Sequence, residues 1–476
     1  MGWHPLGVLR FSQTKAEKVP LNLIEVILAQ GSMAHTSLLF SAVAGLAELP
    51  FFWNDKMANT SHNESLAPVG ADQRVFGWYS HASLWFSLGV GLLVIQLGAY
   101  LVPAVGTQDA LLAIVLGSVL GAGLLGWVAK IACDTGLSSA GLMHQVYGSS
   151  FARLPVLLNI VQLVGWTTFE LVVMRDGTLA MFGNSWWGAA LTATLLWGTV
   201  LTLLTTGSML GLVRSFVSRF GLPLVVLSLL WLSYQFVGLL HAQGWAAFWN
   251  RPGTGEKSML SAMDLVIAMP VSWLPLIADY ARHGNNSKTA LSGSWIGYAI
   301  ANMWCYALGV MVISVSAPDA NLVNTLLLAQ AGLLALGLIL LDELDNAYGD
   351  VYSASVNSHS LWSRLSVKHW GLAIAVVCTA LAVVLPMHDL EPFLLLLSSV
   401  FVPLYGVILG RLGAGATASA PASVNWGAAM IWLSGIAVFH ATANWAPQFG
   451  AALPTLALTF ALAWFSRPAS VAVSHA

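Results

Sequence analysis

Four acidic side chains stand close together in one long apolar stretch, LILLDELDNAYGDVYSASVNS, without a Lys or Arg among them. They are Asp342, Glu343, Asp345 and Asp350. At helical spacing Asp342, Asn346 and Asp350 lie on one face. Carboxylates on a lipid-facing surface are costly, so this face must line water, a substrate or a cation. We expect Asp342 and Glu343 to lie at the start of the span, near the outer interface, and Asp345 and Asp350 to lie deeper.

A further carboxylate, Glu170, follows Trp166 by one helical turn in LVGWTTFELVV. An aromatic face can stack on a flat heterocycle, and a carboxyl group can pair with an amino-plus-ring-nitrogen edge through two parallel hydrogen bonds. Such a site discriminates strongly, because a wrong ligand leaves buried polar groups unpaired. Trp273 also stands beside polar residues, whereas many other Trp fall at the ends of apolar stretches. The alternative for Glu170 is an ion pair with Arg175 near a helix end.

The composition is that of a membrane protein. Of 476 residues, 57% are hydrophobic and 8% are charged, with a formal net charge of −2, whereas a soluble domain carries about 25% charge. This composition excludes a soluble enzyme, a nucleic-acid-binding protein and a secreted disulfide scaffold. Cys133, Cys305 and Cys378 lie far apart and form neither a metal cluster nor a disulfide framework. The sequence also lacks a nucleophile–base arrangement and a phosphate loop, so we predict neither an enzyme nor a cofactor.

About twelve stretches are long and apolar enough to span a bilayer, which takes about 20 residues. Each should be an α-helix, because backbone polar groups in lipid must be satisfied within the segment. The predicted spans are 83–105, 110–130, 153–174, 186–206, 219–240, 262–281, 293–316, 323–341 running on to about 355, 370–386, 392–411, 425–445 and 450–467.

The basic residues between these spans indicate their orientation, because cytoplasmic loops carry an excess of Lys and Arg. Three basic residues fall on one side, namely Arg175, Arg251 and Lys257. Eleven fall on the other side: Arg74, Lys130, Arg153, Arg214, Arg219, Arg282, Lys288, Arg364, Lys368, Arg411 and Arg467. We therefore predict a multi-pass protein of the cytoplasmic (inner) membrane with both termini in the cytoplasm.

The N-terminal stretch lacks a clean span, since Glu25, His35 and Glu48 interrupt the apolar residues 22–52. It also lacks the charged region and the cleavage site of a signal peptide. From Met57 the sequence becomes polar, as a cytoplasmic tail before a first span should. We expect the true start at Met57, with 1–56 a mis-assigned extension. The alternative is a short interfacial helix.

Two predicted spans are interrupted at corresponding places. The first carries Gly89 and Gly91, and the sixth carries Pro270 and Pro275. These spans are the first members of two consecutive blocks of five. Interruptions at matching positions of two halves point to a binding site, because broken helices expose backbone carbonyls and amides. The alternative is that Gly and Pro are common in membrane helices in any case.

Four motifs in this order resemble the nucleobase:cation symporter-1 family, and within it the branch of hydroxymethylpyrimidine transporters and cytosine permeases. Span 1 reads LWFSLGVGLLVIQLGAYLVPAVG, with the family's W–G–G–P spacing. The stretch DTGLSSAGLMHQVYGSSFARLPVLLNIVQLVGWTTFE matches a second motif, with Glu170 where many members have Gln. Span 6 ends in DYAR and span 8 in DVYSASV. The similarity runs from about residue 75 to residue 465.

The resemblance implies a LeuT-type fold, in which two inverted five-helix repeats precede two extra helices. The chain then divides into a cytoplasmic segment (1–74), a first repeat (75–241), a second repeat (260–412), two additional transmembrane helices (423–467) and a tail (468–476). It also implies a secondary active transporter, a symporter that works by alternating access in the lipid bilayer. We expect the protein to act as a monomer and, from its composition, to have no nucleic-acid partner.

The resemblance also implies roles for residues. Trp166 matches the family's Trp that stacks on the substrate, and Glu170 matches the polar residue one turn later. Trp273, on span 6, can stack on the opposite face of the substrate. The substrate-binding Asn region of span 8 falls on Asn346 to Asp350. We expect Asp350 to contact the substrate and Asp345 to couple the cation.

The ion site of the family uses carbonyls of span 1, here Gly89 and Leu92, and hydroxyls of span 8. Here Asp345 and Asn346 stand at the hydroxyl positions, a departure that leaves both Na⁺ and H⁺ open as the coupling ion. The expected substrate is a nucleobase-like heterocycle, either hydroxymethylpyrimidine (a thiamine precursor) or a cytosine-like pyrimidine. The alternatives are an amino-acid or amine transporter of the same fold and an intramembrane enzyme, for which the His residues are too scattered.

Overall fold

The computed structural model describes residues 65–466, except 184, 187, 208–220, 317–321, 386, 388 and 415–421. The predictions made for residues 1–64 and 467–476, including the start at Met57 and the interfacial helix, lie outside the described residues. Within the described part the secondary structure is helical, apart from one isolated β-bridge between Phe76 and Gly284. The helices are η2 (Ala71–Gln73), α3 (Trp78–Ser87), α4 (Leu92–Leu101), α5 (Thr107–Thr135), α6 (Ser139–Tyr147), α7 (Arg153–Phe182), α8 (Ala190–Leu204), α10 (Leu222–Gln243), α11 (Trp245–Trp249), α12 (Met259–Ser272), α13 (Leu274–Ala281), α14 (Ser287–Val315), α15 (Leu322–Leu326), α16 (Gly332–Leu361), α17 (Val367–Val384), α18 (Leu390–Leu412), α19 (Trp426–Trp445), η4 (Pro447–Phe449) and α20 (Ala452–Phe465).

Most of these helices are able to cross a membrane. Among the described residues, eight helical segments are long and apolar enough, and the pair α3 and α4, bent by 63°, makes a ninth. Helices α8 and α20 are apolar but shorter, and α16 is a 30-residue helix that carries the four acids. Each predicted span coincides with one of these helices or helix pairs. The predicted all-α, polytopic membrane class is confirmed.

The helices differ from the predicted spans mainly at their ends. Helix α5 extends to Thr135 and α7 to Phe182, several residues beyond the apolar stretches. Hydropathy marks only the part of a helix that lies in lipid, whereas backbone hydrogen bonding continues through polar residues such as Asp134 and Asp176. The short helices α6 and α11 connect spans and were not predicted. Helix α15 falls inside the eighth predicted span, which starts at 323, whereas the long helix α16 begins only at Gly332, so the predicted start of that span is wrong.

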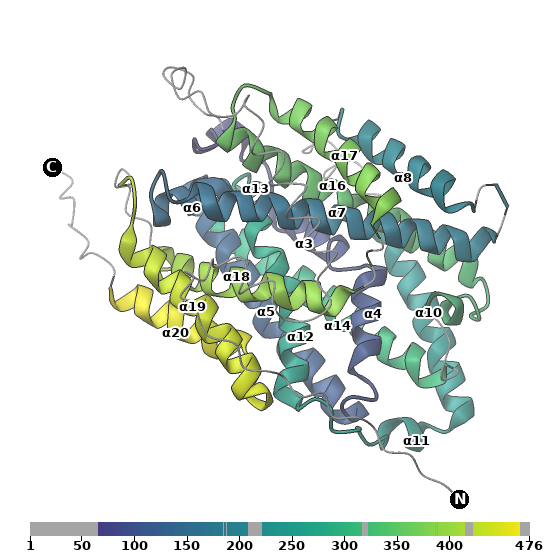
Figure 1. Cartoon of the computed structure of the whole chain (residues 1–476). Helices are drawn as coiled ribbons and strands as arrows, with labels where there is room; N and C mark the ends of the chain where they lie inside the picture. Colours follow the sequence, from purple (N-terminus) through teal and green to yellow (C-terminus); the bar gives the residue numbers. More distant parts are fainter. Residues whose placement is uncertain are drawn as a thin grey trace, which may run out of the picture.

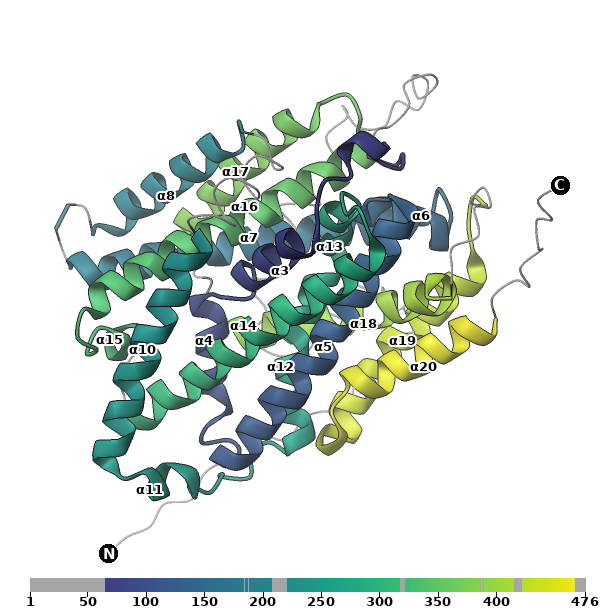
Figure 2. The ribbon, with the colours of Figure 1, turned by 180° about the vertical axis from the view of Figure 1, so that it is seen from behind.

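The helices pack in two groups, which Figures 1 and 2 show from opposite sides. Helices α3, α4, α12 and α13 pack with the long helices α5 and α14, and we call these six the α5/α14 group. Helices α7, α8, α16 and α17 pack on one another and form the α7/α16 group. The candidate site described below lies where α3, α4, α12 and α13 of the first group meet α7 and α16 of the second.

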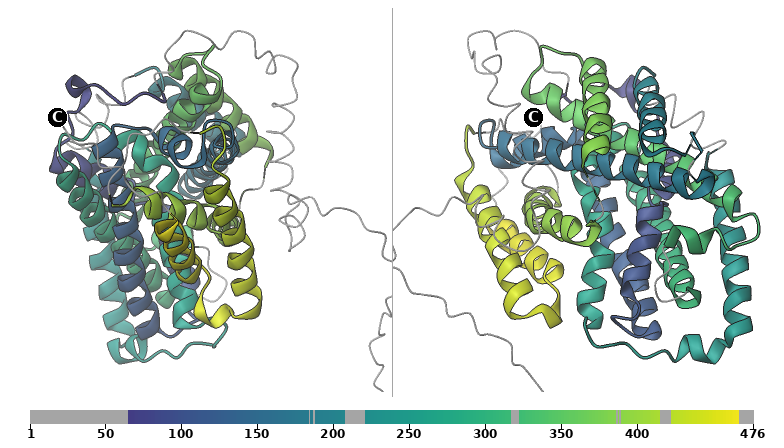
Figure 3. Two further views of the ribbon diagram at one scale, coloured as in Figure 1. Left: turned by 90° about the vertical axis from the view of Figure 1, so that its left-hand side faces the viewer. Right: turned by 45° about the vertical axis from the view of Figure 1, so that its right-hand side comes forward.

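The C-terminal helices α19 and α20 pack against α18 at one side of the molecule, as the two views of Figure 3 show. Asp264 of α12 links this part to the α5/α14 group. Its carboxylate accepts the backbone amides of Ala451 and Ala452 at the start of α20, the second at 3.0 Å. A carboxylate at a helix N-terminus satisfies amides that have no partner inside the helix.

Both predicted interruptions are present. Helix α3 ends at Ser87 and α4 begins at Leu92, so the predicted break around Gly89 and Gly91 is confirmed. Span 6 is divided between α12 and α13 at Trp273, between the two prolines. This second break is milder, because α12 and α13 still form one continuous span.

Candidate functional site

Two side chains of α16 form hydrogen bonds with the backbone at the break between α3 and α4. The Nδ2 amide of Asn346 donates to the carbonyl of Val90 at 3.0 Å, and the carboxylate of Glu343 accepts the backbone amide of Leu92. A Cβ added at Gly91 would lie 3.0 Å from Glu343 Oε1, so the absence of a side chain there permits the close approach. The Val90 carbonyl and the Leu92 amide, two backbone groups at the break, are thereby satisfied by side chains of another helix.

The position of Asp342 and Glu343 corrects one expectation. They do not lie at the start of a span near the interface, because α16 begins at Gly332 and both side chains are buried, at 5% and 1% exposure. Asp342 accepts a hydrogen bond from the Ser87 hydroxyl at 2.8 Å. Both acids therefore face the end of α3 and the start of α4, inside the protein.

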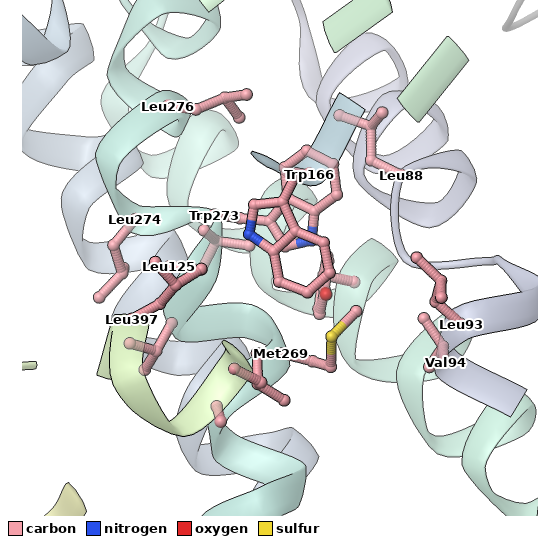
Figure 4. Packing of buried hydrophobic residues seen from close by; sticks show 14 of the residues in the cluster. Leu88, Leu93, Val94, Leu125, Trp166, Met269, Trp273, Leu274, Leu276 and Leu397 are labelled. Carbon is pink, nitrogen blue, oxygen red and sulfur yellow. The ribbon is translucent and has the colours of Figure 1, made fainter. Parts of the chain in front are cut away.

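A small cavity of about 20 Å³ lies against this break. Helix α7 contributes Trp166 and Glu170, α16 contributes Glu343 and Asn346, and the break in span 6 contributes Trp273. Figure 4 shows the two indole rings near Met269, with Leu88, Leu93 and Val94 on the facing side. Because a water molecule needs roughly 10–15 Å³ of such volume, the cavity has room for about one water molecule and is too small for a heterocycle.

Several polar atoms around this cavity are buried without a hydrogen-bond partner among the described residues. They are the indole donors Trp166 Nε1 and Trp273 Nε1, and the oxygen acceptors Glu170 Oε2 and Asn346 Oδ1. Buried polar atoms in proteins are nearly always hydrogen-bonded. The arrangement therefore offers two indole donors and oxygen acceptors from two helices to a ligand that carries complementary groups.

Glu170 has no ion pair with Arg175, so the alternative considered from the sequence is wrong. The Arg175 Nε donates to Asp176 at 2.7 Å, and its Nη1 donates to the Ala382 carbonyl at 3.1 Å. Five residues along a helix place two side chains on different faces. Glu170 is 2% exposed, and no basic side chain among the described residues forms a salt bridge with it.

The remaining expected site residues lie around the cavity rather than in it. Asp350 is 1% exposed, one turn beyond Asn346, and is close enough for its charge to act on Glu170. Asp345 is half-buried and lies near Asp342. A Cβ added at Gly89 would lie 2.8 Å from the Ala301 Cβ, so Gly89 faces α14. At Leu92 the backbone amide donates to Glu343 of α16, whereas the carbonyl was the group expected to contribute to an ion site.

Sequence reasoning missed Phe393, in the first turns of α18. Its ring centroid lies 5.1 Å from that of Trp166, at an interplanar angle of 74°, and also 5.1 Å from that of Phe169. A Cβ added at Gly165 would lie 2.8 Å from the Phe393 ring, so Gly165 makes room for it. A glycine directly before Trp166 was the available signal, but nothing in the sequence identifies the partner that occupies the space.

A larger cavity, of about 270 Å³, lies on the other side of Leu93. It is bounded by α4, α7, α14, α15 and α18, and its polar side chains are Gln96, Tyr100 and Asp176. Leu93 lines both cavities. The two spaces thus adjoin one another, and the larger one lies at the end of α7 that carries Arg175.

Comparison with known proteins identifies relatives of the whole chain. The profile of the family described as permeases for cytosine/purines, uracil, thiamine and allantoin matches residues 68–465. No curated protein matches the chain.

Solved structures share the fold. Mhp1, a nucleobase-cation-symport-1 family transporter in a closed conformation with bromovinylhydantoin bound, aligns with a TM-score of 0.70 at 15% identity, over 85% of this chain and 94% of that one. Its inward-facing form aligns with a TM-score of 0.66 at 16% identity, over 86% and 93%. A Na⁺-coupled sialic acid symporter aligns with a TM-score of 0.56 at 12% identity, over 90% and 96%. The predicted LeuT-type fold is confirmed.

Proposed function

Since this chain belongs to the family of permeases for cytosine/purines, uracil, thiamine and allantoin, we propose that it is a cation-coupled symporter that imports an aminopyrimidine. The best candidates are hydroxymethylpyrimidine and a cytosine-like base. The protein is a multi-pass membrane transporter and not an enzyme.

The observation that carries this proposal is the convergence of Trp166, Trp273, Glu170 and Asn346 on one cavity from three spans. The two indoles supply flat faces for a planar ring. Glu170 Oε2 and Asn346 Oδ1 are acceptors without partners, and they suit the amino group and a protonated ring edge. A carbonyl in place of the amino group would face acceptors and leave them unpaired, so a uracil-like base is the poorer ligand.

The acids of α16 support the coupling part of the proposal. A buried carboxylate without a counter-charge is costly, and a proton or a metal cation removes that cost. We assign Asp345 as the coupling residue, with Asn346, Gly89 and Leu92 around the ion. Na⁺ and H⁺ are both compatible with carboxylate chemistry at this position. Asp350, next to Glu170, is assigned to the substrate side.

The sequence supports a proposal for the orientation and the location of the protein. The excess of Lys and Arg on one side supports cytoplasmic termini and residence in the inner membrane. Residues 75–241 and 260–412 are proposed as the two five-helix repeats, followed by the additional helices in 423–467. Interruption of the first helix of each proposed repeat, at 88–91 and at Trp273, supports this division. We propose that the transporter acts as a monomer.

The test is a melting-temperature measurement on the purified protein with a panel of cytosine, hydroxymethylpyrimidine, uracil, allantoin and amino acids, each with and without Na⁺. The proposal expects aminopyrimidines to raise the melting temperature and to compete with one another for uptake into vesicles. Uptake that amino acids inhibit, and aminopyrimidines do not, would replace it by an amino-acid or amine transporter. A converted product would instead indicate an enzyme.

A further inference from the structure

A second buried polar cluster lies on the side of the molecule that carries Arg282 and Lys288, which we call the basic face. Its centre is Asp279 of α13, which is fully buried. The carboxylate accepts hydrogen bonds from the backbone amide of Ser139 at 3.0 Å, from the Ser353 hydroxyl and from Asn357 Nδ2 at 3.3 Å. One side chain thus joins α6, α13 and α16.

These hydrogen bonds join the two packing groups, because α13 belongs to the α5/α14 group and α16 to the α7/α16 group. The donor from α6 is the amide of Ser139 at the beginning of that helix. Helix N-terminal amides have no partner within their own helix, so Asp279 completes α6 while it holds α16.

The cluster lies between the candidate site and the basic face. Along α16, Asn346 lines the cavity, Gly349 follows one turn later, and Ser353 and Asn357 follow after further turns. Along α13, Trp273 precedes the helix and Asp279 lies near its other end.

Tyrosines fill the layer between the cavity and Asp279. The Tyr280 hydroxyl donates to the Gly349 carbonyl at 3.4 Å, and the Tyr280 and Tyr352 ring centroids are 5.3 Å apart. A ligand that leaves the cavity toward the basic face must therefore part α13 from α16.

We infer that Asp279 is a positioning residue that keeps this exit closed, so that its hydrogen bonds must break before the substrate is released toward the basic face. Alternating access requires one group of helices to move against the other around the bound substrate. Hydrogen bonds to a charged group are stronger than those between neutral groups. The donors are a hydroxyl, a side-chain amide and a backbone amide, which water can replace once the helices separate, so the closure is reversible.

Arg282, one turn beyond Asp279, is itself 7% exposed and acts electrostatically on the carboxylate. No salt bridge between the two side chains is found among the described residues. In this state the hydrogen bonds to α6 and α16, and not an ion pair within α13, hold Asp279 in place.

The experiment uses a reporter cysteine in the layer between the cavity and the cluster. A Cβ added at Gly349 would meet Tyr280 Oη at 3.5 Å and Leu88 Cδ2 at 3.6 Å, which are ordinary contacts, so Gly349→Cys fits. The full chain with this substitution is placed in sealed vesicles of each orientation. The rate of reaction with a membrane-impermeant maleimide is then measured, with the parent chain and its three buried cysteines as the background.

Adding Asp279→Asn to the reporter chain removes the charge but keeps the size. We expect labelling from the basic face to become about tenfold faster, because the loss of one charge-assisted hydrogen bond shifts the equilibrium from the closed toward the open exit by about that factor. Labelling from the other face should stay unchanged. The matched control is Asp134→Asn, because Asp134 is a half-exposed acid at the end of α5, paired with Lys130 at 2.7 Å. It should leave both rates unchanged.

Ser353→Ala removes one donor without touching the carboxylate. It should accelerate labelling in the same direction by less, and the double variant with Asp279→Asn should add little, because both changes act on one contact. If Asp279→Asn does not fold, Ser353→Ala carries the test alone. An unchanged rate in the folded variants, or an equal increase from both faces, would overturn the inference. Labelling needs no substrate, so the result is independent of whether aminopyrimidines are transported.

Discussion

Glu343 of α16 accepts the backbone amide of Leu92, the first residue of α4, and so caps a helix that has no side-chain cap of its own. The carboxylate faces the positive end of the α4 dipole, beside the carbonyl of Val90 that Asn346 satisfies. These two backbone groups of the break are therefore already bonded to side chains of α16. A ligand or ion that uses these groups must displace α16 side chains or share them.

The first prediction concerns this cap. Glu343→Gln keeps an acceptor for Leu92 but removes the charge, so we expect the free energy of unfolding to fall by about 1 kcal/mol. Glu343→Ala leaves the buried amide unpaired and should cost about 1–3 kcal/mol. Denaturant unfolding of the purified protein measures both. Glu256→Gln, at an exposed loop position, is the control. If Glu343→Ala is as stable as wild type, the amide has another partner and the cap is unimportant.

The second prediction concerns Trp166. If its ring stacks on the substrate, Trp166→Ala should lose about 1–3 kcal/mol of binding, by analogy with base–aromatic stacking, and Trp166→Phe should retain part of it. Binding is measured by calorimetry or by competition. Trp426→Ala, which alters a Trp that is 66% exposed at the start of α19, should leave affinity unchanged. Unaltered affinity in Trp166→Ala would mean that this Trp only packs against Phe393 and Phe169.

The third prediction concerns Glu170. Glu170→Gln keeps the shape but replaces one acceptor oxygen by a donor, so we expect selectivity to move from aminopyrimidines toward bases that carry a carbonyl at that position. The ratio of competition constants for cytosine and uracil measures this change. Arg175→Gln is the control, because Arg175 contacts Asp176 and Ala382 and not Glu170. An equal change of the ratio in both variants would place the effect outside the site.

The fourth prediction concerns pH and stability, and it involves His283, in the connection between α13 and α14. Burial, Arg282 and Arg74 lower the pKa of His283 to about 4, against a partial opposing effect of its hydrogen bond to the Gln73 carbonyl. The imidazole is therefore protonated at a higher pH in the unfolded chain than in the folded protein. The free energy of unfolding falls as the pH drops from about 6.5 toward 4, and this group costs no stability above about pH 6.5.

His283→Asn cannot titrate but keeps a donor for Gln73. Between pH 7 and pH 5 the wild type should lose about 1–2 kcal/mol from this group, so the melting temperature of the variant should fall less over that interval. His241→Asn, at an exposed position in α10, should behave as wild type. Parallel curves for His283→Asn and wild type would refute the assignment.

The spans and their breaks were predictable because local sequence determines them. Long apolar stretches must be helical in lipid, and Gly89, Gly91, Pro270 and Pro275 weaken helices wherever they stand. Trp166 and Glu170 were also predictable as neighbours, since one helical turn separates them.

What could not be predicted depends on contacts between distant segments. Glu343 caps α4 only because α16 crosses the break, 251 residues away in sequence. The ring of Phe393 over Trp166 and the hydrogen bonds of Asp279 to α6 and α16 have the same origin. Hydropathy placed Asp342 and Glu343 at an interface because it treats four acids as an end of a span. A hydropathy pattern carries no information about distant hydrogen-bond partners, which here are Ser87 for Asp342 and the Leu92 amide for Glu343.

The last prediction concerns the coupling ion. Asp345 lies near Asp342, and each of the two carboxylates has a buried oxygen without a hydrogen-bond partner among the described residues. Asp345 is the proposed coupling residue because it stands at the position that the family resemblance assigns to the ion site. Asp345→Asn should abolish accumulation against a gradient while exchange or equilibrium binding stays measurable, because the substrate contacts are on other residues. The control is Asp109→Asn, which changes an exposed acid in the first turn of α5; this variant should accumulate substrate normally.

Replacement of external Na⁺ by choline, and separately addition of a protonophore, identifies the ion, since only the treatment that removes its gradient stops uptake. A variant at Asp345 that concentrates substrate as well as wild type would make this carboxylate structural and move the coupling role to Asp342, for which Asp342→Asn is the corresponding measurement.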